Sequence, residues 1–241
     1  MRRSLPALLL ALVTAACASV PGPAAMNTPV ERVATASYAA VVIGAPPLFG
    51  GLGSAVAIDE RHVLTNAHVM RLAGLAVDGA TLVRGDGARA TATLVARSPS
   101  MDLAVLRVPA GFLAPAETAR LPPLPGQPVW AAGTTTVGPG VATGTVLDPA
   151  VEIEGLGVGF VARMGALMGY SGGPVVGQNG RVLGLTTALV RPGAAPLLGM
   201  LTGADLDGLL SFDGREVFVL GIGPAMDEAR RLLAAGGASA R

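Results

Sequence analysis

The apolar residues of this chain fall into short segments, almost all bounded by glycine, proline or another turn residue. Runs of four to eight apolar or β-branched residues between turn signals are typical of β-strands. With 34 glycines and 19 prolines among 241 residues, little room is left for long helices. Because 51% of the side chains are apolar and only 14% are charged, the chain can bury a large core and is not expected to be disordered. The pattern therefore predicts an all-β body.

The expected strands form two groups of similar size, separated by a proline-rich connector over 115–128. We expect a first β unit over 37–115, a second over 116–222, and a C-terminal helix over 223–237. Asp227 and Glu228 early in that helix and arginines later suit the helix dipole. The predicted strands are 38–43, 54–58, 62–65, 91–96 and 103–108 in the first group, and 129–132, 141–146, 159–162, 174–176 and 182–187 in the second.

The N-terminus has the features of an export signal. Two arginines precede an apolar stretch over 5–13 and a run of small residues that contains Cys17, the only cysteine of the chain. We expect a signal peptide over 1–17 with lipidation of Cys17, then a flexible tether over 18–36; ordinary cleavage after Ala18 is the alternative. The protein is thus expected in the bacterial periplasm or envelope, attached to a membrane through lipidated Cys17.

Charge and hydropathy exclude other classes of partner. All 17 basic residues are arginine and face 16 acids, so the formal net charge is only +1 and nucleic-acid binding is not expected. No uncharged apolar stretch approaches the roughly 18 to 20 residues that a membrane-spanning helix needs.

Three polar residues carry the chemistry. His68 lies in the segment Leu-Thr-Asn-Ala-His-Val, Asp102 stands 34 residues later at the start of an apolar strand, and Ser171 follows after 69 more in Gly-Tyr-Ser-Gly-Gly-Pro. A serine hydroxyl becomes a good nucleophile when a neutral imidazole accepts its proton and an acid orients that imidazole. Each residue alone has an ordinary structural explanation, but the combination indicates a His-Asp-Ser triad. The other histidine, His62, follows a turn, and we assign it no role.

These three segments together resemble the chymotrypsin-like, or trypsin-fold, serine proteases, and within them the bacterial HtrA-like branch. The likeness extends over roughly 37–215 and includes the hairpin Asn179-Gly180 after the serine. It implies two six-stranded antiparallel β-barrels with the active site between them. It further implies that Ser171 is the nucleophile, His68 the general base and Asp102 the orienting acid, and that Gly169 and Ser171 supply the oxyanion-hole amides. No metal or cofactor is implied.

The resemblance also indicates where a polypeptide substrate binds. The strand Leu185, Thr186, Thr187 and Ala188 would pair with an extended substrate and form one wall of the primary specificity pocket, with the segment 165–168, beginning at Gly165, opposite. Because neither segment holds a charge, we expect small or medium apolar residues before the cleaved bond.

Two positions depart from the family pattern. Tyr170 stands where many members have the acid that pairs with a newly cut N-terminal amine, so that activation switch is not expected here. Only 70 residues follow Ser171, too few for the rest of the second barrel and a C-terminal peptide-binding PDZ domain. The sequence gives no indication of the oligomeric state.

Two other functions remain to be weighed. The segment Gly169 to Gly173 also satisfies the Gly-x-Ser-x-Gly elbow of α/β-hydrolases, but in that fold the histidine follows the serine, whereas both histidines here precede it. The second alternative is a trypsin-fold protein that no longer cuts and serves as a binding or scaffold module of the envelope; the presence of all three triad residues disfavours it.

Overall fold

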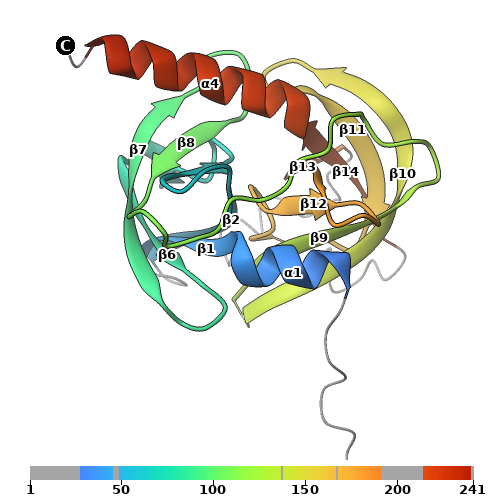
Figure 1. Cartoon of the computed structure of the whole chain (residues 1–241), viewed down its shortest axis with the longest axis horizontal. Helices are drawn as coiled ribbons and strands as arrows, with labels where there is room; N and C mark the ends of the chain where they lie inside the picture. Colours follow the sequence, from blue (N-terminus) through green and yellow to red (C-terminus); the bar gives the residue numbers. More distant parts are fainter. Residues whose placement is uncertain (1–27, 46–48, 137, 167, 191–213, 240–241) are drawn as a thin grey trace, which may run out of the picture.

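A computed structural model of the chain describes residues 28–45, 49–136, 138–166, 168–190 and 214–239. It contains two closed six-stranded antiparallel β-barrels that lie side by side, with a long C-terminal helix across both (Figure 1). The predicted all-β, two-barrel architecture with a C-terminal helix is confirmed.

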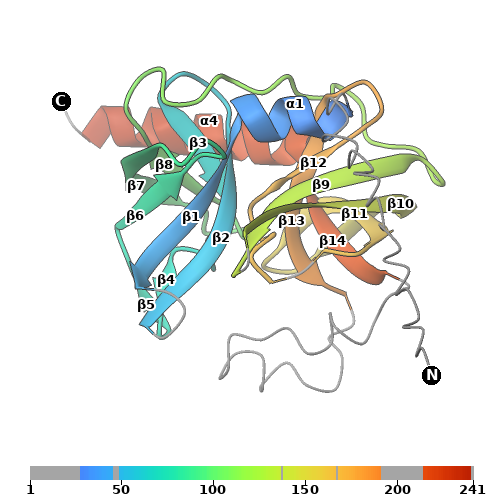
Figure 2. The ribbon, with the colours of Figure 1, turned by 90° about the horizontal axis from the view of Figure 1, so that it is seen from below.

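The first barrel closes in the strand order β1-β2-β3-β8-β7-β6. Its interior is filled by small and medium aliphatic side chains such as Val41, Val63, Leu82 and Leu106, all fully buried. A two-stranded hairpin of β4 and β5 projects from it (Figure 2). The strands are β1 Tyr38–Ala45, β2 Phe49–Ala57, β3 His62–Thr65, β4 Arg71–Leu72, β5 Leu75–Ala76, β6 Gly79–Val83, β7 Arg89–Arg97 and β8 Ala104–Arg107.

The second barrel closes in the order β10-β11-β14-β13-β12-β9. Phe160, Met164, Val175 and Val219 fill its interior. Five of the six strands in each barrel coincide with predicted segments, whereas β6 and β14 were not predicted. The strands are β9 Pro128–Thr135, β10 Gly138–Ile153, β11 Gly157–Met164, β12 Pro174–Val176, β13 Val182–Leu189 and β14 Arg215–Gly221.

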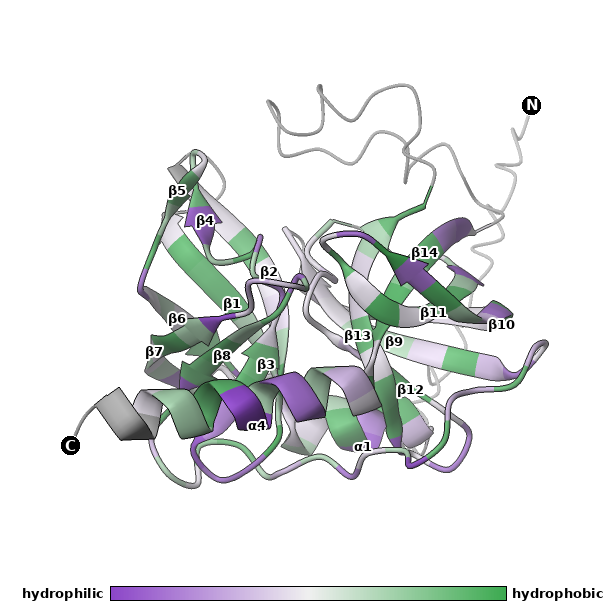
Figure 3. Cartoon of the chain, turned by 90° about the horizontal axis from the view of Figure 1, so that it is seen from above, coloured by the Kyte–Doolittle hydropathy of each residue, from purple (hydrophilic) through white to green (hydrophobic). Residues whose placement is uncertain are grey.

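A third apolar cluster joins the barrels to the helices. Leu64 and Leu103 of the first barrel meet Leu185 and Phe218 of the second, and Leu232 of the C-terminal helix packs into the same cluster. Figures 2 and 3 show both helices on the face of the molecule opposite the β4-β5 hairpin. Burial of this cluster fixes one barrel against the other and so sets the geometry of any site between them.

Residues 28–36, expected to be the end of a flexible tether, instead form a helix and its cap. Helix α1, Pro29–Ala36, begins after Thr28, whose backbone N–H donates to the Glu31 carboxylate (2.7 Å). Val30 and Val33 are buried against the body of the protein. The tether prediction is wrong here because the capping residues start a helix whose apolar face has a surface to cover. Residues 18–27, the signal peptide and Cys17 lie outside the described residues.

The C-terminal helix α4, Ile222–Ser239, lies across both barrels (Figure 3). Ala225 and Ala229, on the face of α4 that packs against the barrels, are fully buried. Glu228 accepts hydrogen bonds from the Ser98 hydroxyl of the first barrel (2.6 Å) and from the Arg231 guanidinium. These hydrogen bonds hold the pKa of Glu228 below its usual value, the arginine being the larger cause and burial opposing it. Among the described helices, none combines the length and apolar character needed to cross a bilayer.

Candidate active site

His68 and Asp102 form a directly bonded pair at the edge of the first barrel. His68 follows β3 and Asp102 precedes β8, and these two strands are paired, which brings their ends together. The carboxylate oxygen Oδ2 of Asp102 lies 2.5 Å from His68 Nδ1, and Oδ1 accepts the His68 backbone N–H at 2.9 Å. Asp102 is buried, whereas the His68 side chain is 48% exposed. An ionised carboxylate at Nδ1 places the imidazole proton there and leaves Nε2 as a base that faces away from Asp102.

Asn66 holds this pair and links it to the second barrel. Its Nδ2 donates to the Asp102 carbonyl (2.9 Å) and to the Thr187 hydroxyl on β13 (3.1 Å). Asn66 is fully buried, so these hydrogen bonds operate away from solvent. The histidine side of the site is thereby fixed to the strand predicted to bind substrate.

Ser171 lies in the loop between β11 and β12, and the first barrel holds that loop on both sides of Tyr170. The Ser54 hydroxyl on β2 donates to the Gly169 carbonyl (2.7 Å), and the Ser54 backbone N–H donates to the Ser171 carbonyl (2.8 Å). Tyr38 lies within hydrogen-bond distance of the same hydroxyl at 3.3 Å. Sequence reasoning did not assign Ser54 or Asn66 a role, although Asn66 lies two residues before His68 in a segment on which the family resemblance rests.

The nucleophile loop also packs against the segment that leads to His68. A Cβ atom at Gly172 would overlap the Ser54 carbonyl and the Thr65 hydroxyl and would come within 3.0 Å of the Asn66 backbone nitrogen. The structure therefore brings Ser171 beside the 65–68 segment by close backbone packing. Within the described residues, no hydrogen bond joins the Ser171 hydroxyl to His68. In enzymes without bound substrate, catalytic hydrogen bonds are often long or poorly aligned.

The two amides predicted for the oxyanion hole are available. In the described parts of the chain, the N–H groups of Gly172 and Gly173 donate to Thr186 and Tyr170 carbonyls at 2.8 Å, but those of Gly169 and Ser171 donate to no group. Gly169 has φ +95°, a conformation that L side chains rarely adopt. The loop thus presents two N–H groups beside the serine.

Tyr170 packs beneath the nucleophile loop. Its ring occupies space left open on two neighbouring strands, because a Cβ at Gly133 of β9 or at Gly140 of β10 would overlap the tyrosine side chain. Tyr170 is buried, and burial raises the pKa of its phenol. A buried tyrosine therefore occupies the position at which many family members have an acid that pairs with an N-terminal amine.

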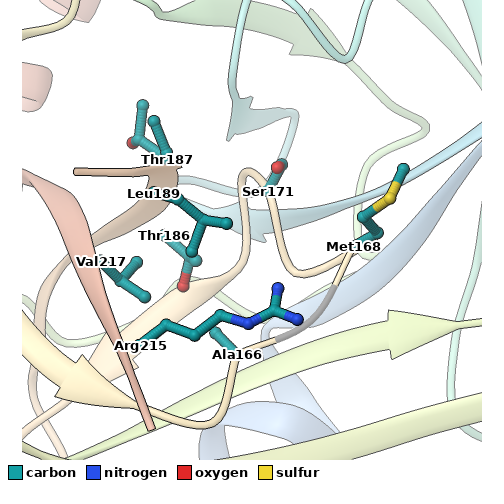
Figure 4. A pocket seen from close by; sticks show the side chains of 9 residues that line it. Ala166, Met168, Ser171, Thr186, Thr187, Leu189, Arg215 and Val217 are labelled. Carbon is teal, nitrogen blue, oxygen red and sulfur yellow. The ribbon is translucent and has the colours of Figure 1, made fainter. Parts of the chain in front are cut away.

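A cavity of about 110 Å³ opens beside Ser171, where the resemblance led us to expect the primary specificity pocket (Figure 4). Thr186, Thr187 and Ala188 line it as predicted. Two predicted lining residues do not, since the Leu185 side chain points into the apolar core and Gly165 borders a different surface hollow. The remaining walls are Ala166, Met168, Leu189, Arg215 and Val217.

Arg215 is the pocket residue that sequence reasoning missed. It lies on β14, which pairs with β13 and forms a third wall of the pocket. The prediction of an uncharged pocket took account of only two walls, the segments 165–168 and 185–188. The premise that the pocket is free of charge is therefore incomplete. No local signal marks Arg215, because it stands 44 residues after Ser171 and reaches the pocket only through strand pairing.

The remaining histidine lies outside the site. His62 Nδ1 pairs with the Asp59 carboxylate at 2.9 Å. Burial raises the pKa of Asp59, but backbone and His62 hydrogen bonds outweigh it and lower the pKa overall. In the described part of the chain, no group of three His, Cys, Asp or Glu side chains is placed to hold a metal ion.

A His-Asp pair on one antiparallel barrel and a half-buried serine on the other, with free amides beside it, define the class of two-barrel proteins with the trypsin fold. The chain belongs to the family of trypsin-like peptidase domains, whose model matches residues 53–185.

Known proteins support this assignment. The chain is 31% identical over 176 residues to the serine protease Rv3671c of Mycobacterium tuberculosis, a match that covers 68% of this chain and 43% of that protein. The chain thus spans less than half the length of this curated relative. The crystal structure of the active form of the Rv3671c protease is similar with a TM-score of 0.65 at 25% identity, covering 88% of this chain and 87% of that one. The structure of the HtrA-type protease AlgW with a tripeptide is similar with a TM-score of 0.65 at 25% identity. That match covers 86% of this chain and 63% of the AlgW chain.

Proposed function

We propose that this protein is a serine endopeptidase that hydrolyses peptide bonds in polypeptide substrates. The observation that carries the proposal is the buried Asp102 carboxylate at 2.5 Å from His68 Nδ1, with the Ser171 loop packed against the same segment. A carboxylate that orients an imidazole beside a serine is the arrangement that activates a hydroxyl nucleophile. A non-catalytic module would have no need for this pair.

In the proposed reaction Ser171 Oγ attacks the carbonyl carbon of the cleaved bond while His68 Nε2 takes its proton. The N–H groups of Gly169 and Ser171 donate to the oxyanion, and Asp102 stabilises the imidazolium. His68 then gives the proton to the leaving amine, and the acyl-enzyme remains on Ser171. Water, deprotonated by His68, attacks the acyl carbon, and return of that proton to Ser171 releases the acid.

The substrate chain is proposed to bind as an added β-strand. Ala188 and Leu189 pair with β14 on one side, and no other strand pairing is present for them in the described residues. An open strand edge beside the nucleophile suits main-chain hydrogen bonding to an extended peptide. A cavity of about 110 Å³ with mostly apolar walls favours a small or medium side chain before the cleaved bond.

Proteolysis of an unfolded protein tests the proposal. We expect the purified wild-type protein to cleave reduced casein, with new termini identified by mass spectrometry, and Ser171→Ala to leave it intact. His62→Ala is the matched control and should cleave at the wild-type rate. Equal cleavage by wild type and Ser171→Ala would indicate a contaminating protease and contradict the proposal.

We further propose that the protein is exported and anchored in the bacterial envelope through lipidated Cys17. The sequence features that support this are the arginines, the apolar run and the small residues that precede Cys17. Metabolic labelling with a radioactive fatty acid tests it. Label on the wild type and none on Cys17→Ser would support the anchor, whereas an unlabelled wild type cut after Ala18 would overturn it.

A further inference from the structure

The specificity pocket contains one charged side chain. Among the nine described residues that line it, only Arg215 carries a charge, and the others are small, apolar or hydroxylated. Figure 4 shows the Arg215 side chain running across the pocket, with its guanidinium below Ser171 between Ala166 and Met168. A substrate side chain that enters this pocket therefore comes near a cation.

Strand geometry explains why this arginine faces the pocket. Alternate residues of a strand share a face, so Arg215 and Val217 of β14 both line the cavity. The residue between them, Glu216, faces the other way and lies 3.9 Å from the Arg163 guanidinium on the neighbouring strand β11. The acid next to Arg215 in the sequence is thus directed away from the pocket.

A second polar group lines the same cavity. The Thr186 hydroxyl is buried and has no hydrogen-bond partner in the described residues. Buried hydroxyls in proteins almost always have a partner, so one that lines a substrate pocket is well suited to a ligand atom. A carboxylate oxygen accepts from both a hydroxyl and a guanidinium, whereas an apolar side chain satisfies neither.

We propose that this pocket selects substrates with an acidic side chain, aspartate or glutamate, before the cleaved bond, and that Arg215 and the Thr186 hydroxyl bind its carboxylate. The inference rests on the proposed peptidase function and specifies its substrate class. The cavity of about 110 Å³ admits a side chain of this size, and its apolar walls contact the methylene groups. Arg215 also has a partner within the protein, and its five N–H donors allow it to keep that contact while it binds a carboxylate.

The glutamate-to-glutamine comparison isolates the charge, because the two side chains have nearly the same size. Charge-assisted hydrogen bonds are substantially stronger than neutral ones. We expect kcat/KM to be roughly ten- to a hundredfold higher for glutamate than for glutamine before the cleaved bond. Leucine at that position should fall below glutamate as well.

The first test measures binding and does not require turnover. Short alanine-based peptides that span the bond, with Glu, Gln or Leu before it, are titrated by fluorescence anisotropy against the Ser171→Ala protein. Tighter binding of the Glu peptide supports the proposal. Equal binding of Glu and Gln peptides, or tightest binding of Leu, overturns it.

Variants assign the preference to the pocket residues. In the Ser171→Ala background, Arg215→Gln should abolish the Glu over Gln preference, Arg215→Lys should retain part of it, and Thr186→Val should weaken it severalfold. Arg163→Gln is the matched control, an arginine of the neighbouring strand outside the pocket, and should leave the preference unchanged. If Arg215→Gln fails to fold, the wild-type and Arg215→Lys proteins still test the proposal. Loss of the Glu over Gln preference in a folded Arg215→Lys protein would contradict a role for the positive charge.

The same peptides separate this inference from the proposed function. Hydrolysis with the highest kcat/KM for Leu would leave the peptidase intact and remove the acid preference. Selective binding of the Glu peptide, without hydrolysis and without reaction at Ser171, would overturn the peptidase function and keep the acidic pocket.

Discussion

At the scale of single residues, a few hydrogen bonds connect the two barrels at the site. Ser54 donates to the Gly169 and Ser171 carbonyls of the nucleophile loop, and Asn66 joins Asp102 to Thr187. These contacts are buried, so each is expected to hold its partner in one orientation. Of the three proposed catalytic groups, the His68 side chain is 48% exposed and Ser171 is half-buried, whereas Asp102 is buried.

The first prediction concerns Asp102. Asp102→Asn should lower kcat by roughly 10⁴, as this change does in serine-protease triads, because the amide no longer holds the imidazole in the productive tautomer. Steady-state kinetics on a cleavable peptide measure the effect, with thermal melting as a check on folding. A loss of less than tenfold would show that Asp102 does not orient the base.

The packing of the Tyr170 ring against Gly133 gives a second prediction. Gly133→Ala places a methyl group where the tyrosine ring lies, so the ring and the adjoining Ser171 must shift. We expect at least a tenfold fall in kcat and a loss of about 1–3 kcal/mol in the free energy of unfolding. Gly85→Ala, where nothing lies within 4 Å, is the matched control and should change neither quantity much. Unchanged activity in Gly133→Ala would contradict the role of Tyr170 in positioning the loop.

Alkaline titration tests the burial of Tyr38. Burial raises the pKa of Tyr38 from 10.0 to about 12, although its hydrogen bond to Ser54 opposes the shift. The folded state keeps the phenol protonated where the unfolded chain ionises, so stability is full below pH 10 and falls between pH 10 and about 12. The slope from this group is at most about 1.4 kcal/mol per pH unit.

The chain contains no lysine, so few other groups titrate in this range. Urea denaturation at several pH values should show that the free energy of unfolding declines above pH 10 in the wild type and declines less steeply in Tyr38→Phe. Identical slopes in the two proteins would contradict the stated burial.

At the scale of elements, the helices are part of the folded body. Val30 of α1 is fully buried against the barrels. Val30→Ala should therefore lower the free energy of unfolding by about 2 kcal/mol, measured from the denaturation midpoint at constant slope. Thr35→Ala, on the exposed side of α1, should stay within about 0.5 kcal/mol. Equal stability of all three proteins would mean that this segment behaves as the tether that the sequence predicted.

The sequence predicted most strands because their apolar runs are bounded by turn residues. It missed β14 because four apolar residues directly before a helix, Val217 to Leu220, do not by themselves distinguish a strand from a helical extension. It missed β6 because the segment begins with glycine and has only two buried side chains. In both cases the strand is defined by pairing with distant neighbours.

The same limit applies to the site. His68, Asp102 and Ser171 stand in local motifs whose chemistry is readable from the residues alone. Arg215 and Thr186 come together only because β13 pairs with β14, and the hydrogen bond from Asn66 to Thr187 joins residues 121 positions apart. The proposed catalytic residues could therefore be named from the sequence, whereas the lining of the proposed specificity pocket required the fold.

At the scale of the whole molecule, two barrels without a disulfide between described residues are held together by one apolar cluster and two helices. Leu64 and Leu103 of the first barrel pack with Leu185 and Phe218 of the second. The site lies across this junction, so its geometry depends on the packing of both barrels. We propose that this junction produces an activated serine.

Reaction with a serine-directed fluorophosphonate, followed by mass spectrometry of the folded protein, tests that claim most directly. Wild type, Ser171→Ala and His68→Ala are compared, with His62→Ala as the control. We expect a single adduct on Ser171 in the wild type and in His62→Ala, and none in Ser171→Ala or His68→Ala. A folded wild-type protein that forms no adduct, or one that reacts equally well without His68, would contradict it.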